Sequence, residues 1–122
     1  MISHVKFISI PTADQDLALK FWTERVGFQV FTDQPFNDQQ RWIELRIGSS
    51  DTRLVLFMFD EQGLQPGMRF NGALASDNVE QTYQELAARG VEFISPPQKQ
   101  AWGTFAMFKD PDGNQFLLSS SR

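Results

Sequence analysis

His4 is the only histidine of this 122-residue chain, and its imidazole is the side chain best suited to acid–base or metal chemistry. Cysteine is absent, so the sequence provides no disulfide, no thiol nucleophile and no thiolate metal site. One histidine without a companion motif does not predict a serine–histidine–aspartate triad, and no glycine-rich segment has phosphate-loop spacing. His4 is therefore either a structural or exposed residue, or one that contacts a ligand or moves a proton.

The carboxylates that stand in recognisable patterns have simpler structural interpretations. Asp110 and Asp112 belong to an Asp-Pro-Asp-Gly-Asn segment, in which proline fixes φ and Gly113 takes a positive φ, so we expect a tight turn. Glu44 lies in the β-type run Trp-Ile-Glu-Leu, where a solvated or cross-strand-paired carboxylate is expected. None of the three indicates catalysis.

Aromatic residues offer a stronger signal for binding. Phenylalanine occurs twelve times and aromatic residues make up 13% of the chain, a surplus that is typical of an apolar pocket in addition to a core. Because strand side chains alternate between two faces, only about half of the strand aromatics can face a cavity. The candidates are Phe7, Trp42, Phe57, Phe59, Trp102 and Phe105.

Trp102 is the strongest of these candidates because it lies in a loop after the bend at Pro96-Pro97, where an indole can close over a ligand. Arg41 and Arg46 lie on one predicted strand. They are either ordinary surface charges or cations that neutralise an anionic group of the ligand.

Composition excludes several classes of function. The net charge is −4 and the eleven basic residues are scattered, which argues against nucleic-acid binding. No apolar run approaches the roughly 20 residues that span a bilayer. The first residues resemble a strand and not a signal peptide, so we expect a soluble cytoplasmic protein.

The first half of the chain predicts one helix among four strands. A helix capped by Asp14 or Asp16 carries Leu17 and Phe21 at helical spacing and ends at Gly27. Residues 33–40 are polar and predict a long loop or lid. The predicted strands are 4–10, 28–32, 41–47 and 53–59.

The second half predicts the same order. Residues 60–67 carry two glycines and one proline and are interpreted as a linker. A helix capped by Asp77 or Asn78 ends at Gly90. Residues 91–94 are short and extended, and 95–100 are not a central strand because two prolines lack ladder donors. The predicted strands are 70–75, 104–109 and 115–119.

The halves therefore repeat a β-α-β-β-β unit, with landmarks offset by roughly 60 residues. One unit is too small to bury both faces of its sheet, so two should complete each other within one domain. We expect module 1 at about 1–60 and module 2 at about 68–122.

This organisation resembles the vicinal oxygen chelate superfamily, which includes glyoxalase I, bleomycin-resistance proteins, fosfomycin-resistance enzymes and extradiol dioxygenases. The resemblance covers nearly the whole chain and implies an α+β fold with a curved mixed sheet around a cavity, in a homodimer. The segments that carry it are Phe21-Trp22, Gly27-Phe28, Arg89-Gly90-Val91-Glu92-Phe93, Pro96-Pro97, Trp102-Gly103 and Phe108-Lys109-Asp110-Pro111-Asp112-Gly113-Asn114.

Metal-dependent members of that superfamily take histidine, glutamine or glutamate ligands from the first and last strands of each half. The resemblance places these positions at His4, at Asn71, at Leu117 and at Val55 or Leu56. Only His4 matches, so we expect no metal and no other cofactor.

The sequence thus predicts metal-independent binding of a small apolar or aromatic molecule in a cavity. A metal-dependent lyase or dioxygenase with a displaced ligand set is the alternative, and a dimeric interaction protein without catalysis is a further one. Whether the protein is an enzyme stays open. The predicted ligand-binding residues are His4, Trp42, Arg46, Phe57, Trp102 and Phe105.

Overall fold

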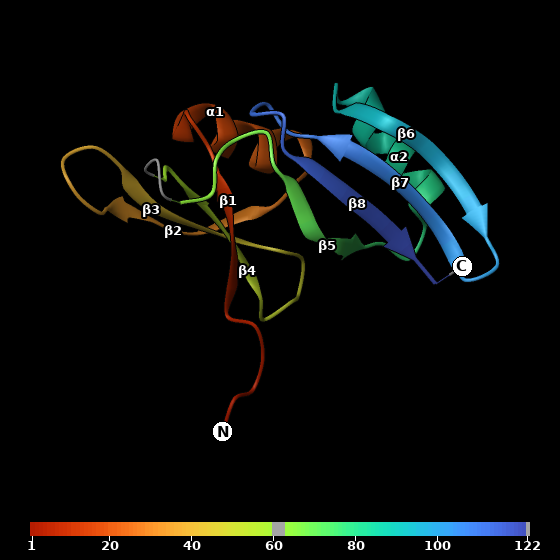
Figure 1. Cartoon of the computed structure of the whole chain (residues 1–122), viewed down its shortest axis with the longest axis horizontal. Helices are drawn as coiled ribbons and strands as arrows, with labels where there is room; N and C mark the ends of the chain where they lie inside the picture. Colours follow the sequence, from red (N-terminus) through yellow and green to blue (C-terminus); the bar gives the residue numbers. More distant parts are fainter. Residues whose placement is uncertain (60–62, 122) are drawn as a thin grey trace. The chain divides into compact units, whose positions relative to one another are not determined.

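The computed structural model describes residues 1–59 and 63–121 and divides the chain into unit 1 (Met1–Pro66) and unit 2 (Gly67–Arg122). Both units have the same order of elements, which Figure 1 colours along the chain. Unit 1 contains β1 (Phe7–Pro11), α1 (Gln15–Lys20), the π-helical turn η1 (Phe21–Arg25), β2 (Gln29–Pro35), β3 (Arg41–Arg46) and β4 (Arg53–Phe57). Unit 2 contains β5 (Arg69–Ala75), α2 (Val79–Ala88), β6 (Glu92–Gln100), β7 (Gly103–Lys109) and β8 (Gln115–Ser120).

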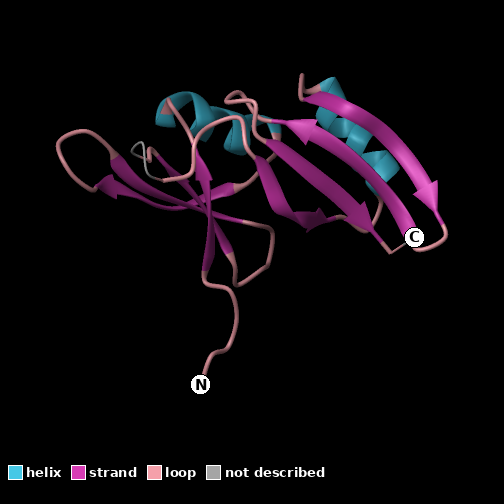
Figure 2. Cartoon of the chain, viewed as in Figure 1, coloured by secondary structure: helices cyan, strands magenta, loops and turns pink. Residues whose placement is uncertain are grey.

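The two sheets have the same topology. Their strand orders are β1-β4-β3-β2 and β5-β8-β7-β6. In each, the first strand is parallel to the last and the other pairs are antiparallel. Figure 2 colours the strands magenta and the helices cyan. The predicted α+β repeat of β-α-β-β-β units is confirmed.

The helices begin and end where local chemistry predicts. Asp14 caps α1 by accepting the Leu17 N–H at 3.1 Å, and Asn78 caps α2 by accepting the Gln81 N–H at 3.0 Å. Gly27 and Gly90 follow the helices with φ of 95° and 90°, a conformation that other residues rarely adopt. No helix in the described ranges is long and apolar enough to cross a membrane.

One face of each sheet is apolar and buried against a helix. In unit 1, where α1 packs against β4, the residues of this face are 0% exposed. They are Ile10, Ile43, Leu45, Leu54 and Leu56. In unit 2, α2 packs against three strands, and it contributes Val79 and Leu86 to a core with Ala106, Phe108, Phe116 and Leu118. Because alternate residues face opposite sides of a sheet, the other face of each sheet is free to carry different chemistry.

The first strand starts later than predicted. β1 begins at Phe7, so the expected strand over 4–10 is wrong for its first three residues. The reason is that β4, the neighbouring strand, begins at Arg53, which pairs with Phe7. Before that point the described residues show single bonds and no ladder: the Lys6 carbonyl accepts the Arg53 N–H at 3.0 Å, and the Val5 carbonyl accepts the Thr52 hydroxyl at 2.6 Å.

Two predicted boundaries in unit 1 are also wrong. β2 continues to Pro35, since Asp33 pairs with Ile43 and extends the ladder into the expected loop of 33–40. β4 ends at Phe57 and not at residue 59. The Gln40 side chain accepts the Met58 N–H at 2.9 Å and donates to the Met58 carbonyl at 3.0 Å, taking the place of a strand there. Of the expected linker at 60–67, residues 60–62 lie outside the described part of the chain.

The proline segment of unit 2 forms the end of an edge strand. β6 runs from Glu92 to Gln100 and pairs only with β7, so the prediction that 95–100 is not a central strand is confirmed. The expected stop at Ile94 is wrong. The register shifts between Ser95 and Gln98, so the two prolines occupy an irregularity where ladder donors are not needed.

Candidate functional site

The second face of the unit 1 sheet, called here the aromatic face, carries large and charged side chains. On β3, Trp42, Glu44 and Arg46 alternate with the enclosed Ile43 and Leu45. The antiparallel register places Glu44 opposite Val55 and Arg46 opposite Arg53, so these pairs share this face. β1 adds Phe7 at its edge, beside Arg53.

Five rings on and beside this face form a connected group, the aromatic cluster. It consists of Phe7, Phe36, Trp42, Phe57 and Phe59. The Trp42 ring centroid lies 5.6 Å from that of Phe7, 5.9 Å from that of Phe36 and 5.5 Å from that of Phe57. Two further edge contacts, 5.1 Å between Phe36 and Phe57 and 5.3 Å between Phe57 and Phe59, complete it. The structure therefore brings together Trp42 and Phe57, two of the predicted ligand-binding residues.

Phe36 is a member that sequence reasoning did not nominate. It belongs to the short connection between β2 and β3 and is 55% exposed. The Asn37 side chain holds this connection by accepting the N–H groups of Gln39 at 2.8 Å and Gln40 at 3.0 Å. Phe36 thus contacts Trp42 and Phe57 while more than half of the residue stays accessible.

A polar chain runs beside the aromatic cluster. The Trp42 Nε1–H donates to Glu44 Oε1 at 2.9 Å, and Arg53 approaches Glu44 Oε2 at 3.5 Å. Glu44 is only 9% exposed, so the indole and the guanidinium supply partners that water would otherwise supply. The expectation of a cross-strand-paired carboxylate at Glu44 is confirmed. The indole is also fixed in one orientation within the cluster.

The two arginines that the sequence nominated have different environments. Arg41 contacts Asp33 at 2.9 Å and Asp16 at 2.7 Å. The hydrogen bonds from Asp33 and then Asp16 raise the pKa of Arg41 above its ordinary value. Arg41 is therefore already neutralised. Arg46 instead lies 4.7 Å from the centroid of the Phe31 ring.

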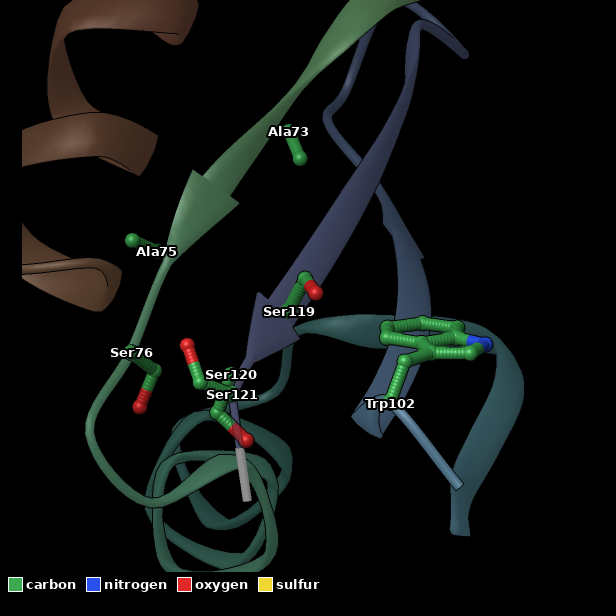
Figure 3. A pocket seen from close by; sticks show the side chains of 7 residues that line it. All are labelled: Ala73, Ala75, Ser76, Trp102, Ser119, Ser120 and Ser121. Carbon is green, nitrogen blue, oxygen red and sulfur yellow. The ribbon is translucent and has the colours of Figure 1, made fainter. Parts of the chain in front are cut away.

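Unit 2 presents a separate set of candidate residues. Trp102 projects from the turn between β6 and β7, as predicted, and stacks on Phe105 with centroids 5.7 Å apart and planes inclined by 16°. It is 57% exposed. Trp102 also borders a hollow of about 330 Å³, shown in Figure 3 with Ala73 and Ala75 from β5 and Ser119 from β8. Small side chains on these strands leave room beside the indole.

His4 does not join either group among the described residues. It is exposed and precedes β1, and its imidazole lies 2.9 Å from the hydroxyl of the adjacent Ser3. The chemistry of the family's four metal positions does not fit a metal ion either. Leu117, and Val55 or Leu56 at the position expected in the first half, have no donor atom, and Asn71 provides an amide. No cluster of three or more histidine, aspartate or glutamate side chains with metal-binding geometry occurs in the ranges 1–59 and 63–121.

The Asp110–Asn114 turn has a structural role. Asp110 accepts the N–H groups of Asp112 and Asn114 and the Asn114 side-chain amide, at 2.9 to 3.0 Å. The amide oxygen of Asn114 accepts the N–H groups of Gly67 at 2.9 Å and Met68 at 3.2 Å. Burial outweighs these donors and raises the pKa of Asp110 from 3.8 to about 6. The turn thus anchors the chain that leads into β5.

Comparison with known proteins identifies the family. The model of the Glyoxalase/Bleomycin resistance protein/Dioxygenase superfamily matches residues 2–118. The chain therefore belongs to this superfamily, and the resemblance drawn from its motifs is confirmed.

Relatives of similar length exist among bacterial proteins. YetH of Bacillus subtilis is 35% identical over 118 residues, which cover 97% of this chain and 98% of YetH. A protein of Shewanella frigidimarina is 30% identical over 126 residues, covering 97% of this chain and 93% of its own.

Two solved structures are similar over nearly their full length. TnmS3, an antibiotic binding protein from Streptomyces sp. CB03234, is 37% identical with a TM-score of 0.87, and the match covers 99% of this chain and 98% of TnmS3. A superfamily member from Sphaerobacter thermophilus is 30% identical with a TM-score of 0.89, covering 98% of each chain.

Proposed function

We propose that this protein binds a planar aromatic small molecule without a metal ion, and that it sequesters or senses the compound. The observation that carries this proposal is the aromatic cluster. Five rings, each within 5.9 Å of at least one other, lie on and beside one sheet face, and one of them is Trp42, whose orientation is held by Glu44. A core cluster would be enclosed like Phe108, whereas Phe36 is largely exposed and available to a ligand.

A second support comes from unit 2. Trp102 and Phe105, both predicted to bind the ligand, form a stacked pair with more than half of the indole residue accessible. Such a pair offers a flat surface on which another ring system can stack. The antibiotic-binding relative TnmS3 adds support for capture of a small molecule.

Metal independence is supported by the donor chemistry described above, because aliphatic side chains occupy two of the four family positions. Elemental analysis of protein purified without chelator or affinity tag tests it. We expect no stoichiometric zinc, nickel, manganese or iron. About one tightly held metal per chain, lost in His4→Ala, would contradict the proposal and favour a lyase or dioxygenase.

We further propose that the protein works as a homodimer in the cytoplasm. Among the described residues, the outer strands of both sheets pair on one side, and Val30, at 47% exposed, lies on the outer strand β2. Light scattering at micromolar concentration should give twice the mass of one chain. A mass near 14.0 kDa would contradict the dimer.

The central experiment is a fluorescence titration with anthracene carboxamide, an uncharged planar probe. We expect Trp42→Leu and Phe57→Leu each to weaken binding by roughly thirtyfold, equivalent to about 2 kcal/mol for a buried aromatic contact. Phe93→Leu is the matched control, because Phe93 contacts Tyr83 of α2 on the enclosed side of the unit 2 sheet. Its affinity should stay within about twofold of the wild type.

Unchanged affinity in Trp42→Leu, Phe57→Leu and Trp102→Leu together would contradict the proposal. Loss of affinity only in Trp102→Leu would place the site on unit 2. Near-ultraviolet circular dichroism of each variant separates lost contact from lost structure.

A further inference from the structure

Arg46 and Arg53 stand side by side on the aromatic face. They are directly opposite each other in the antiparallel pairing of β3 with β4. Like charges at opposed positions of a sheet destabilise it, so this arrangement needs a compensating interaction. Part of that compensation is visible within the described residues, and part is missing.

A phenylalanine holds both guanidinium groups. Phe31 lies where the β2–β3 register shifts, between Val30, which pairs with Leu45, and Thr32, which pairs with Glu44. The extra residue of such a bulge is turned out of the regular alternation, which re-aims its side chain. The Phe31 ring centroid lies 3.5 Å from the guanidinium carbon of Arg53 and 4.7 Å from that of Arg46. These cation–π contacts orient the two arginines.

The carboxylate of Glu44 does not compensate the positive charges of both Arg46 and Arg53. One Glu44 oxygen lies 3.5 Å from Arg53, and the other accepts the N–H of the Trp42 indole. Arg46 has no carboxylate within 4.0 Å among the described residues. Arg41 at the other end of β3 shows the contrast, since it has two carboxylate partners. One positive charge therefore remains beside the aromatic cluster.

We infer that Phe31, Arg46 and Arg53 recognise an anionic oxygen group, such as a carboxylate or phenolate, on the aromatic ligand. This inference rests on the proposed function and specifies its ligand class. Trp42 and Arg46 are four residues apart on one strand, or roughly 13 Å along its axis. A fused ring system that stacks on Trp42 reaches Arg46 with a charged substituent at its far end. The guanidinium then donates its parallel N–H groups to the two oxygens of a carboxylate.

A pair of probes that differ in one charge tests the inference. Anthracene carboxylate and anthracene carboxamide share their ring system, and their affinities are measured by fluorescence titration at neutral pH and low salt. We expect the wild type to bind the carboxylate about tenfold more tightly, as a partly exposed charge-assisted contact allows. Added salt should reduce this preference and leave carboxamide binding unchanged.

Variants of Arg46 test whether the preference comes from this place on the aromatic face. Arg46→Gln should abolish the preference by weakening only carboxylate binding, and Arg46→Lys should retain part of it. Arg25→Gln is the matched control, since it removes an exposed positive charge from η1. It should leave the preference unchanged. Carboxamide affinity serves as a folding control in every variant.

The outcomes separate this inference from the function on which it rests. Equal binding of both probes by the wild type would overturn the anionic ligand class and leave aromatic binding intact. A preference that persists in Arg46→Gln would overturn the role of these arginines. Failure of the wild type to bind either probe would overturn the proposed function and this inference together.

Discussion

Replacing Asn114 with alanine should remove a buried side chain that holds the chain leading into β5. Asn114 is 0% exposed, and its amide oxygen accepts the Gly67 and Met68 N–H groups at 2.9 and 3.2 Å. Its amide nitrogen donates to Asp110 Oδ2 at 2.9 Å. Asn114→Ala therefore breaks three side-chain hydrogen bonds at once and leaves a small cavity.

The expected cost follows from the surroundings of each bond. At neutral pH, the bond to the ionised Asp110 contributes about 1.5–3 kcal/mol because it involves a charged and buried acceptor. Gly67 is exposed and Met68 half-buried, so water replaces part of their lost bonds, and these add about 1 kcal/mol together. The free energy of unfolding should fall by roughly 3 kcal/mol, a large part of the 5–15 kcal/mol typical of a domain.

Urea unfolding at pH 7.5, monitored by circular dichroism, measures this change as a lower midpoint at constant slope. Asn37→Ala is a matched control. Asn37 also accepts two backbone N–H groups, at 2.8 and 3.0 Å, but it is exposed. Its loss should cost less than about 1 kcal/mol, because water takes its place. Equal costs for the two variants would refute the argument that burial of the Asp110–Asn114 turn determines its contribution.

Three further expectations follow from the same geometry. The pKa of Asp110 is about 6 in the folded chain against an ordinary 3.8, so the folded state holds the proton more tightly, and stability should fall as pH rises from about 4 to 6. The full effect is about 3 kcal/mol at most, and a stability–pH curve of Asp110→Asn that keeps the wild-type slope would contradict it. Trp102→Ala should cost less than about 1 kcal/mol of stability, because its indole is largely exposed, yet weaken aromatic binding by roughly thirtyfold. Lost stability with unchanged affinity would make Trp102 structural. Phe31→Leu should reduce the preference for anthracene carboxylate over the carboxamide several-fold while sparing carboxamide affinity, since it removes the ring that orients Arg46 and Arg53. An unchanged preference in this titration would show that the arginines are held by other contacts.

Part of the predicted lid at 33–40 can still be tested. Its first three residues belong to β2, but residues 36–40 form the connection that carries Phe36. Hydrogen exchange should find the N–H groups of residues 38 and 39 less protected than those of β4. Equal protection would make this connection a fixed wall of the site.

Local chemistry is sufficient to determine much of this protein from its sequence. Asp14 and Asn78 cap helices because a short polar side chain reaches an N–H group three residues away. Gly113 forms the turn before β8 with φ of 81°, because glycine adopts the positive φ that this turn requires. Trp102 lies in a turn because of its immediate neighbours. The family motif combines such local signals, and the superfamily is therefore recognisable from the amino-acid sequence alone.

The tertiary structure alone decided which side chains meet. Arg41 and Arg46 are indistinguishable in the sequence, but strand register gives one two carboxylates and the other a phenylalanine ring. Phe31 gave no signal, because a bulge arises from the pairing of two strands and not from the residues of one. Arg53 acquires its place only when β4 pairs with β3. A shift of one residue in that pairing would turn Arg53 and Phe57 of β4 to the opposite face, away from Arg46 and Trp42, so the site depends on register.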